Sequence, residues 1–97
     1  MTVEDFIFTI GYQEDTAIVD GRALRLYGKL TTEELAQKGF FKSAFCSALY
    51  AEDENEAERV LAIYNKHTNS SYVSISDLKR LFGVYSVPDG ISKVLRV

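Results

Sequence analysis

The sequence predicts a small α+β domain: a small antiparallel sheet, made of an N-terminal meander and a C-terminal strand, packed against three or four short helices. Three observations lead to this prediction. β-Branched and aromatic residues dominate the first third of the chain, helix-capping signals and helical spacing dominate its middle, and strand-forming residues return in residues 91–97. Strands grouped before helices are typical of the α+β class, in which helices cover one face of the sheet.

A single domain is expected from the length of 97 residues, since a chain of this size can bury a core of its own. Hydrophobic residues make up 46% of the sequence and charged residues 26%. These values lie in the ordinary range of globular proteins and argue against disorder. We therefore treat residues 1–97 as one α+β domain.

The first third of the chain predicts three strands that follow one another as a meander. Residues 6–12 (FIFTIGY) alternate large apolar side chains onto one face, and residues 16–19 form a second, shorter strand. Asp20 and Gly21 both tolerate a positive φ, which favours a two-residue hairpin turn. Residues 22–29 would then form the third strand of the meander.

The clearest helix start lies at Thr31. Its hydroxyl is expected to accept a hydrogen bond from the backbone of Glu34, whose carboxylate accepts one in return, which makes a capping box. Leu30 and Leu35 occupy the two positions of a hydrophobic staple across this start. Gly39 follows the short helix at a position where a left-handed residue commonly ends one.

Two further helices are predicted from apolar residues that recur at helical spacing. They cover residues 41–50 and 55–67, and their apolar stripes do not share one phase. A break is therefore expected near Glu52 and Asp53, where Asp53 and Glu56 form a second capping box. The acidic side chains gathered here suit a helix N-terminus, because the helix dipole stabilises negative charge at that end.

A fourth helix and a final strand complete the predicted fold. Ser74 and Asp77 form a capping box, Val73 takes the staple position before it, and Gly83 provides the stop. A turn follows, and residues 91–97 have the composition of a strand. We expect this strand to return to the sheet, since an unpaired apolar strand favours aggregation. The sequence leaves open whether it pairs within its own chain or with a second copy.

Residues 30–50 resemble the first two helices of helix-turn-helix regulators, with a cap, the sequence Glu-Leu-Ala and a glycine turn before a second helix. The resemblance implies that the second helix reads DNA bases, which needs Arg, Lys, Asn or Gln on its exposed face. This helix offers only Lys42, Ser43 and Ser47. We therefore interpret the segment as a capped short helix followed by a core helix. Nucleic-acid binding is an alternative, through this segment and the basic tail, with Lys42, Lys79 and Arg80 as contacts.

Few residues offer catalytic or metal-binding chemistry. The chain has one cysteine, Cys46, and one histidine, His67, and antiparallel helices would hold the two several turns apart. One of each cannot supply a zinc site, and the acidic run lacks the ligand order of a calcium loop. We therefore expect no metal, no cofactor and no catalytic residue, so that enzymatic activity would need a site assembled by the fold.

The charge and the N-terminus bear on location. The net charge of −3 does not favour nucleic acid or an anionic membrane surface. The first residues have neither the basic leader of a signal peptide nor a spanning segment, and a lone cysteine fits a reducing compartment. We expect a soluble cytoplasmic protein.

The tyrosines favour a protein partner. Six tyrosines are many for this length, and tyrosine is common at interfaces because it buries a large area at low entropic cost. Our leading interpretation is a small interaction or regulatory module, which includes the option of a homodimer. A small-ligand binder with a pocket assembled by the fold is a further alternative. The candidate interaction residues are Arg22, Arg25, Tyr27, Tyr50 and Tyr64.

Overall fold

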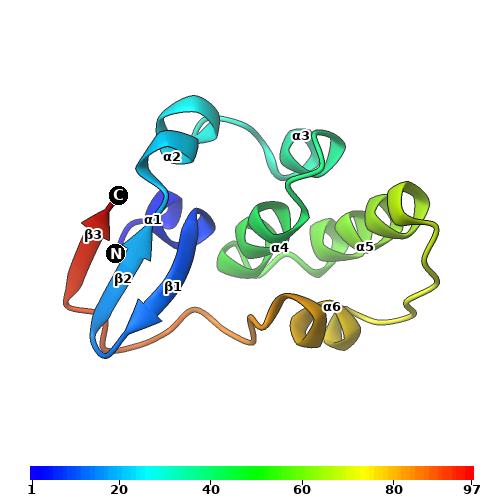
Figure 1. The fold of residues 1–97 in the computed structure, drawn as a ribbon. Helices are drawn as coiled ribbons and strands as arrows, with labels where there is room; N and C mark the ends of the chain where they lie inside the picture. Colours follow the sequence, from blue (N-terminus) through cyan, green and yellow to red (C-terminus); the bar gives the residue numbers. More distant parts are fainter.

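The computed structural model describes all 97 residues and confirms the α+β class. Figure 1 shows a sheet at one end of an elongated molecule and a group of helices at the other. In chain order the elements are α1 (Val3–Ile7), β1 (Thr9–Gln13), β2 (Thr16–Val19), α2 (Gly21–Tyr27), α3 (Thr32–Gln37), α4 (Phe41–Tyr50), α5 (Glu54–Thr68), α6 (Ile75–Phe82) and β3 (Lys93–Arg96). We call α3 to α6 the helical region, and α1, α2 and the three strands the sheet region.

The sheet is mixed and has the strand order β1-β2-β3. β1 and β2 form the predicted antiparallel hairpin, whereas β3 pairs with β2 in parallel, from Thr16 opposite Lys93 to Val19 opposite Arg96. The expectation of a purely antiparallel sheet is therefore wrong for its last strand. A parallel neighbour needs a long crossover, and here the crossover contains the whole helical region. The final strand pairs within its own chain.

The third strand predicted for residues 22–29 is wrong, because α2 begins directly after Asp20. The Asp20 carboxylate accepts a hydrogen bond from the Ala23 N–H at 3.0 Å, which caps the helix. Asp-Gly suits a hairpin turn, but aspartate is also among the best helix caps. The residues that follow include alanine, arginine and two leucines, all strong helix formers.

The strand predicted for residues 6–12 is wrong in its first part. Thr2 and Asp5 form a capping box that starts α1, and β1 begins only at Thr9. Phe6 and Phe8 are nevertheless buried, because a short helix followed by a turn directs both rings into the interior. The apolar character of these two residues therefore predicts their burial but not their backbone conformation.

The helical region confirms most of the predicted helix starts and stops. Thr31 and Glu34 form the expected capping box, and so do Ser74 and Asp77. Asp53 accepts from the Glu56 N–H at 3.1 Å, although the reciprocal bond of a complete box is absent. The glycines after α3 and α6 both have a positive φ. The predicted staple at Val73 is wrong, since this side chain is 87% exposed.

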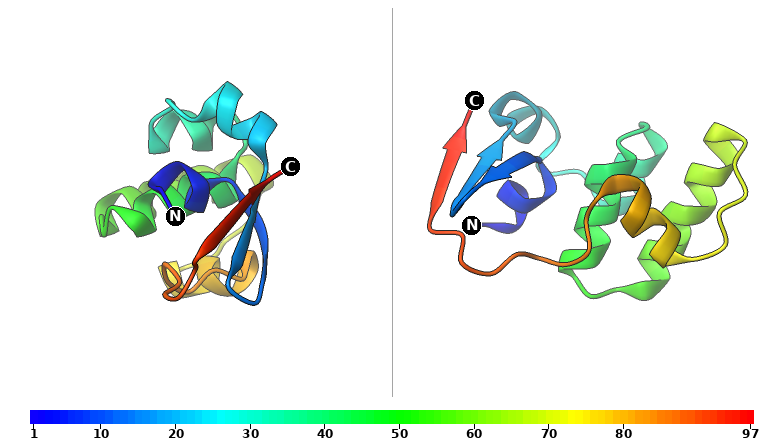
Figure 2. Two further views of the ribbon diagram at one scale, coloured as in Figure 1. Left: turned by 90° about the vertical axis from the view of Figure 1, so that its left-hand side faces the viewer. Right: turned by 60° about the horizontal axis from the view of Figure 1, so that its bottom comes forward.

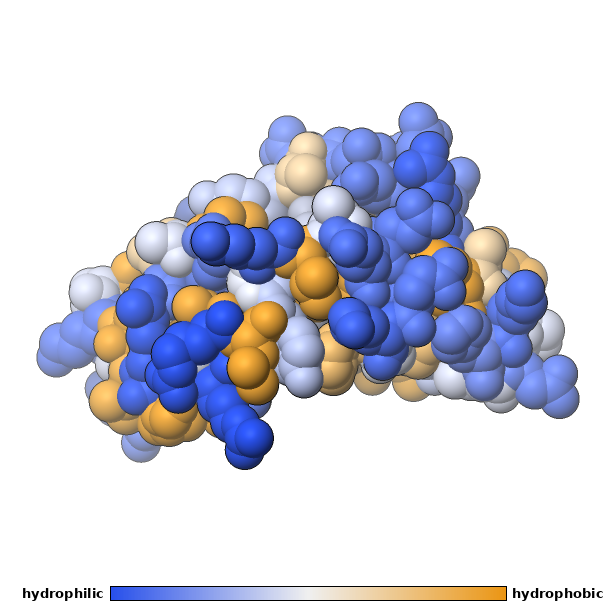
Figure 3. All heavy atoms as spheres, turned by 90° about the horizontal axis from the view of Figure 1, so that it is seen from above, coloured by the Kyte–Doolittle hydropathy of each residue, from blue (hydrophilic) through white to orange (hydrophobic).

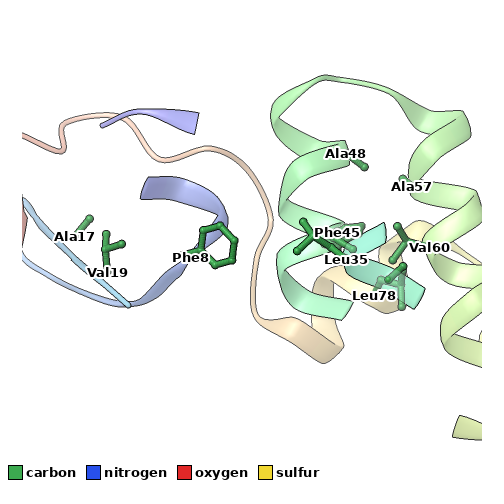
Figure 4. Close-up of a cluster of buried hydrophobic side chains, with 11 residues drawn as sticks. Phe8, Ala17, Val19, Leu35, Phe45, Ala48, Ala57, Val60 and Leu78 are labelled. Carbon is green, nitrogen blue, oxygen red and sulfur yellow. The ribbon is translucent and has the colours of Figure 1, made fainter. Parts of the chain in front are cut away.

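The hydrophobic core is formed around α4, which packs against α1, α3 and α5. Ala44, Phe45 and Ala48 on α4 are almost fully buried, and the small side chains let neighbouring helices approach closely. Figure 4 shows that the core side chains fall into two groups, with Phe8, Ala17 and Val19 on the sheet side and the others between the helices.

An ion pair ties the two ends of the chain together. Arg96 on β3 donates to the buried carboxylate of Asp5 on α1, with Nη2 and Oδ1 at 3.0 Å. Burial alone would raise the pKa of Asp5, but hydrogen bonds from Thr2 and Arg96 hold the pKa below its usual value. The carboxylate is therefore ionised at neutral pH.

Candidate functional site

A groove in the helical region has a volume of about 560 Å³. It lies where the end of α4, the start of α5, α6 and the segment after α6 come together. Figure 2 shows α6 beside α4 and α5, with the chain after it running back to the sheet. The volume falls in the range of about 300–1,000 Å³ that is typical of small-molecule pockets.

Small side chains on two antiparallel helices form the floor of the groove. Ala48 on α4 and Ala57 on α5 face each other near the turn that joins the two helices, with Phe45 and Leu49 beside them. α6 has 8 residues and α5 has 15, so α6 covers only part of the surface that the helix pair offers. The apolar surface that stays open to solvent comes from the half-buried side chains of Leu49, Ile75 and Val87, because Phe45, Ala48 and Ala57 beneath them are buried.

The far wall of the groove comes from α6 and from the chain that leaves it. Ile75 supplies an apolar side chain at the start of α6, and Val87 supplies another from the segment that returns to the sheet. Tyr85 stands beside them with 61% of its surface exposed. An exposed aromatic ring at the mouth of an apolar groove can stack on a ligand without reorganisation of the fold.

Three carboxylates line the other rim of the groove: Glu52, Asp53 and Glu54. The two ion pairs of the structure are Arg80 with Asp77 and Arg96 with Asp5, so none of these three acids has a basic partner. Asp53 caps α5, and Glu54 lies in the first turn, where the helix dipole favours it.

Lys79 on α6 is the one basic residue among the groove-lining residues. Three carboxylates against one ammonium give the groove a net negative charge. Uncompensated charge beside an apolar floor distinguishes this groove from an ordinary gap between helices, and it favours a ligand that is both apolar and cationic.

The five predicted interaction residues do not form one surface. Arg22 and Arg25 are exposed on α2, which is a helix and not the third strand predicted for residues 22–29. Tyr27 is half-buried against Phe40, with ring centroids 4.6 Å apart. Seen from above, hydrophobic side chains show between hydrophilic ones at the sheet end of the molecule (Figure 3).

The two helical tyrosines lie in different environments. Tyr50, at the end of α4, is exposed and packs its ring toward Phe6. Tyr64 is half-buried in an aromatic cluster, with Phe41 at 5.0 Å and Phe82 at 5.8 Å between ring centroids. Tyr64 therefore contributes to the core rim, which is an ordinary position for tyrosine.

The residues that resemble a helix-turn-helix form two helices of the hydrophobic core. α3 is a short capped helix and α4 is buried among α1, α3 and α5, which confirms the interpretation drawn from the sequence. Lys42 and Tyr50 are the only fully exposed residues of α4, so this helix offers few side chains that could reach base edges. Of the three candidate nucleic-acid contacts, Lys42 is exposed on α4, Lys79 lines the groove, and Arg80 pairs with Asp77.

Cys46 is buried on α4 and His67 lies in the last turn of α5, and no hydrogen bond joins the two side chains. Burial of Cys46 raises the pKa of its thiol to about 11, so the thiol is neutral and unreactive at pH 7. His67 packs edge-on against Phe41 at the start of α4, with centroids 5.7 Å apart. No group of three or more His, Cys, Asp or Glu side chains is placed to hold a metal ion.

Comparisons with protein-family models, with curated proteins and with solved structures each return no match. None of the helices combines the length and the apolar composition that a membrane span requires. The assignment of a site therefore depends on the geometry of the fold.

Sequence reasoning missed the groove. It recognised the acids at residues 52–54 only as a helix N-terminal feature, and it counted Tyr85 only among the tyrosines. Ala48 and Ala57, two small residues close to the turn between α4 and α5, are the feature of the sequence that could have indicated the site. They form the floor of a groove only because α6 and the segment after it pack beside them.

Proposed function

We propose that the protein is an interaction module that binds a basic, amphipathic segment of another protein in the groove between α4, α5 and α6. One observation carries the proposal: an apolar floor is bordered by three carboxylates that have no basic partner within the chain. A basic amphipathic segment offers both complements, since its apolar side chains can enter the groove while its Lys and Arg side chains reach the rim.

The free energies expected from apolar burial and from exposed ion pairs give the floor and the rim of the groove different roles. Burial of one large apolar side chain contributes about 1.5–3 kcal/mol, whereas one exposed ion pair contributes about 0.2–1 kcal/mol. The floor therefore supplies most of the affinity. The acids decide which sequences bind, because like charges at the rim disfavour an acidic segment.

A peptide fits this groove better than a small molecule does. The groove is partly open to solvent and does not enclose a ligand on all sides. Enclosed pockets are what small ligands need, since they bury most of their surface on binding. A segment of a protein partner can leave part of its surface exposed and still gain contacts along an open groove.

Tryptophan fluorescence can test the proposal, because the chain contains no tryptophan. A Tyr85→Trp variant places a single reporter at the mouth of the groove. The probes are two synthetic amphipathic peptides, one of leucine and lysine and one in which glutamate replaces lysine. We expect a saturable change of emission with the lysine peptide only. Equal responses to both peptides, or no response to either, would contradict the proposal.

Two further substitutions in the reporter background test the role of charge. Glu52→Gln is expected to weaken binding of the lysine peptide by about two- to fivefold, the size of one exposed ion pair. Lys79→Gln is expected to strengthen it, because a repulsive charge is removed. Glu58→Gln is the matched control, since Glu58 is exposed on α5 outside the groove.

The Lys79→Gln variant also distinguishes a protein partner from nucleic acid. If Lys79 were a phosphate contact, its removal would weaken binding of an oligonucleotide and reduce the salt dependence of that binding. The peptide hypothesis predicts the opposite direction for the lysine peptide. A stronger interaction with an oligonucleotide than with the lysine peptide in wild type would overturn the assignment.

A further inference from the structure

β3 presents a free edge at the end of the molecule. The strand lies at the outside of the sheet with no element covering it (Figures 1 and 2), and all of its residues are exposed. The exposed fractions of Val94, Leu95 and Val97 are 37%, 53% and 64%. An exposed apolar edge strand is a template for pairing with another chain.

The direction of the backbone hydrogen bonds shows which groups are free. The N–H groups of Lys93 and Val97 donate to carbonyls of the adjacent chain segment at 3.2 and 2.9 Å. In a parallel ladder the backbone N–H and C=O groups of every second residue bond to the same neighbouring strand. The backbone groups of Leu95 therefore also bond to β2. The N–H and C=O groups of Val94 and Arg96 therefore point away from the sheet and have no backbone partner.

The opposite edge of the sheet is protected. β1 carries an irregularity between Thr9 and Gly11, where the register shifts by one residue. A bulge twists a strand and disrupts a ladder that another chain could extend. β3 has an unbroken register against β2 over all four of its residues. Of the two edges of the sheet, β3 is therefore the one that can pair with another strand without interruption.

We propose that β3 pairs with β3 of a second copy of this chain, antiparallel and across a two-fold axis at Leu95. The pairing would join the two three-stranded sheets into one continuous sheet. Val94 then exchanges both backbone hydrogen bonds with the partner's Arg96, and Arg96 with the partner's Val94. The protected edge at β1 leaves no second surface for growth, so the assembly closes as a dimer.

The absence of facing cations selects this register, and a second copy is the occupant because its β3 offers the same free N–H and C=O groups in the antiparallel direction. With the axis at Leu95, Lys93 lies opposite the partner's Val97 and Arg96 lies opposite the partner's Val94, so no two cations face each other. An axis at Arg96 would oppose two guanidinium groups, which is destabilising in a strand pair. An axis at Val94 would need the N–H of Ser92, which already donates to Asp15 at 2.9 Å.

The basic residues of β3 do not block the pairing. Charged side chains on edge strands usually prevent association. The guanidinium group of Arg96, however, forms an ion pair with Asp5 of its own chain. Lys93 is the one cation of the strand without an acidic partner, and it lies at the end of the strand. The centre of the proposed interface is therefore apolar.

Cysteine cross-linking tests the register directly. The Cα atoms of a non-hydrogen-bonded antiparallel pair lie about 4.5 Å apart, which is within the range of about 4.4–6.8 Å that a disulfide spans. Leu95→Cys should therefore form a covalent dimer under mild oxidation. Lys93→Cys is the matched control, because its position lies opposite the partner's Val97 and should not cross-link with itself. The native Cys46 is buried and stays reduced.

Native mass spectrometry at several concentrations tests the assembly without cross-links and without any peptide, so its result is separate from that of the groove. We expect a concentration-dependent dimer. Val94→Pro removes one outward N–H in each copy and keeps the bonds to β2, and should raise the dimer Kd by about tenfold or more. Val94→Thr retains the N–H and should leave the Kd nearly unchanged.

Circular dichroism verifies that the proline variant folds. If it does not fold, Leu95→Lys replaces it. Two ammonium groups would then meet at the two-fold axis of the dimer, whereas in the monomer this side chain is exposed and its replacement should not disturb the fold. A wild-type protein that stays monomeric at all concentrations would overturn the proposal. So would equal cross-linking of the Leu95→Cys and Lys93→Cys variants.

Discussion

The helical region and the sheet region differ in how they are held together. Eight of the eleven residues of the main core cluster belong to α3, α4, α5 and α6, and only Phe8, Ala17 and Val19 come from the sheet region. In the helical region, α3, α4 and α5 contact one another and α6 contacts α5, so all of these contacts join elements that are near in the chain. The sheet depends on a strand that arrives from the far end of the chain, and on the ion pair between Asp5 and Arg96.

Because of this difference, we expect the two regions to differ in stability, and each region carries one of the two proposed interaction surfaces. A region made of neighbours in sequence loses little entropy on closing its contacts, whereas the pairing of β3 closes a long loop. We therefore expect the helical region to be the more stable unit and the sheet region to open first. The groove lies on the stable unit, and the free strand edge lies on the other.

The largest effect is expected from Phe45→Ala, since Phe45 is fully buried on α4 and its ring lies 5.8 Å from that of Phe82. The loss of a buried phenylalanine costs about 3–5 kcal/mol of the free energy of unfolding. Val19→Ala removes fewer buried atoms from the sheet and should cost about half as much or less. Urea unfolding followed by circular dichroism measures both.

Hydrogen exchange on the same two variants tests the comparison between the regions. We expect Val19→Ala to increase exchange mainly in the strands, and Phe45→Ala to increase it throughout the protein. Tyr85→Ala is the control, because this exposed side chain should change stability by less than about 0.5 kcal/mol. Uniform loss of protection in both core variants would mean that the two regions open as one unit.

The second effect concerns the ion pair that ties α1 to β3. Arg96→Met leaves the Asp5 carboxylate buried without its cation; the side chains of Arg96 and Asp5 are 55% and 4% exposed. We expect a loss of about 1–2 kcal/mol at neutral pH, limited because water can reach part of the freed group. Chemical denaturation of both proteins at neutral and acidic pH measures this loss.

The pH dependence of this loss has a definite sign. The pKa of Asp5 is lowered in the folded state, so its contribution is fully present above the unfolded value of about 3.9. The contribution disappears as the pH falls through the lower folded pKa. The gap in stability between wild type and Arg96→Met should therefore narrow below about pH 4. A gap that stays constant across this range would show that lost packing, and not charge, is responsible.

Helix signals explain why the fold of the helical region could be predicted and that of the sheet region only in part. Capping boxes at Thr31 and Ser74 were read correctly because helical apolar spacing follows each of them. The same box at Thr2, with Asp5, was missed, since the aromatic residues after it favour a strand. Local patterns conflict there, and burial of the two phenylalanines decides the outcome.

The sequence predicts that the last strand returns to the sheet, but neither the direction of that strand nor the groove could be predicted from it. The parallel direction of β3 depends on the path of the chain through the helices, and no residue of β3 specifies it. The groove likewise needs α6 and the segment around Tyr85 to lie beside α5. Individual residues of the site, such as the acids at residues 52–54, are visible in the sequence, whereas their arrangement around an apolar floor is tertiary.

The smallest effect is expected from Gly21, at the junction of α2 with the end of β3. Gly21 donates its N–H to the Val97 carbonyl at 3.0 Å, and a Cβ on this residue would lie 3.1 Å from that oxygen and 3.5 Å from Cβ of Arg96. In an open helix Gly→Ala stabilises by about 0.5–1 kcal/mol.

Here the contact should cancel that gain, so Gly21→Ala is expected to be destabilising by about 1 kcal/mol or less. Gly11→Ala is the matched control, because a Cβ there meets nothing within 4 Å. Thermal unfolding of the two variants compares them. A stabilised Gly21→Ala protein would mean that β3 can shift outward at no cost, and that the end of the strand is held by Asp5 and Arg96 rather than by its close approach to α2.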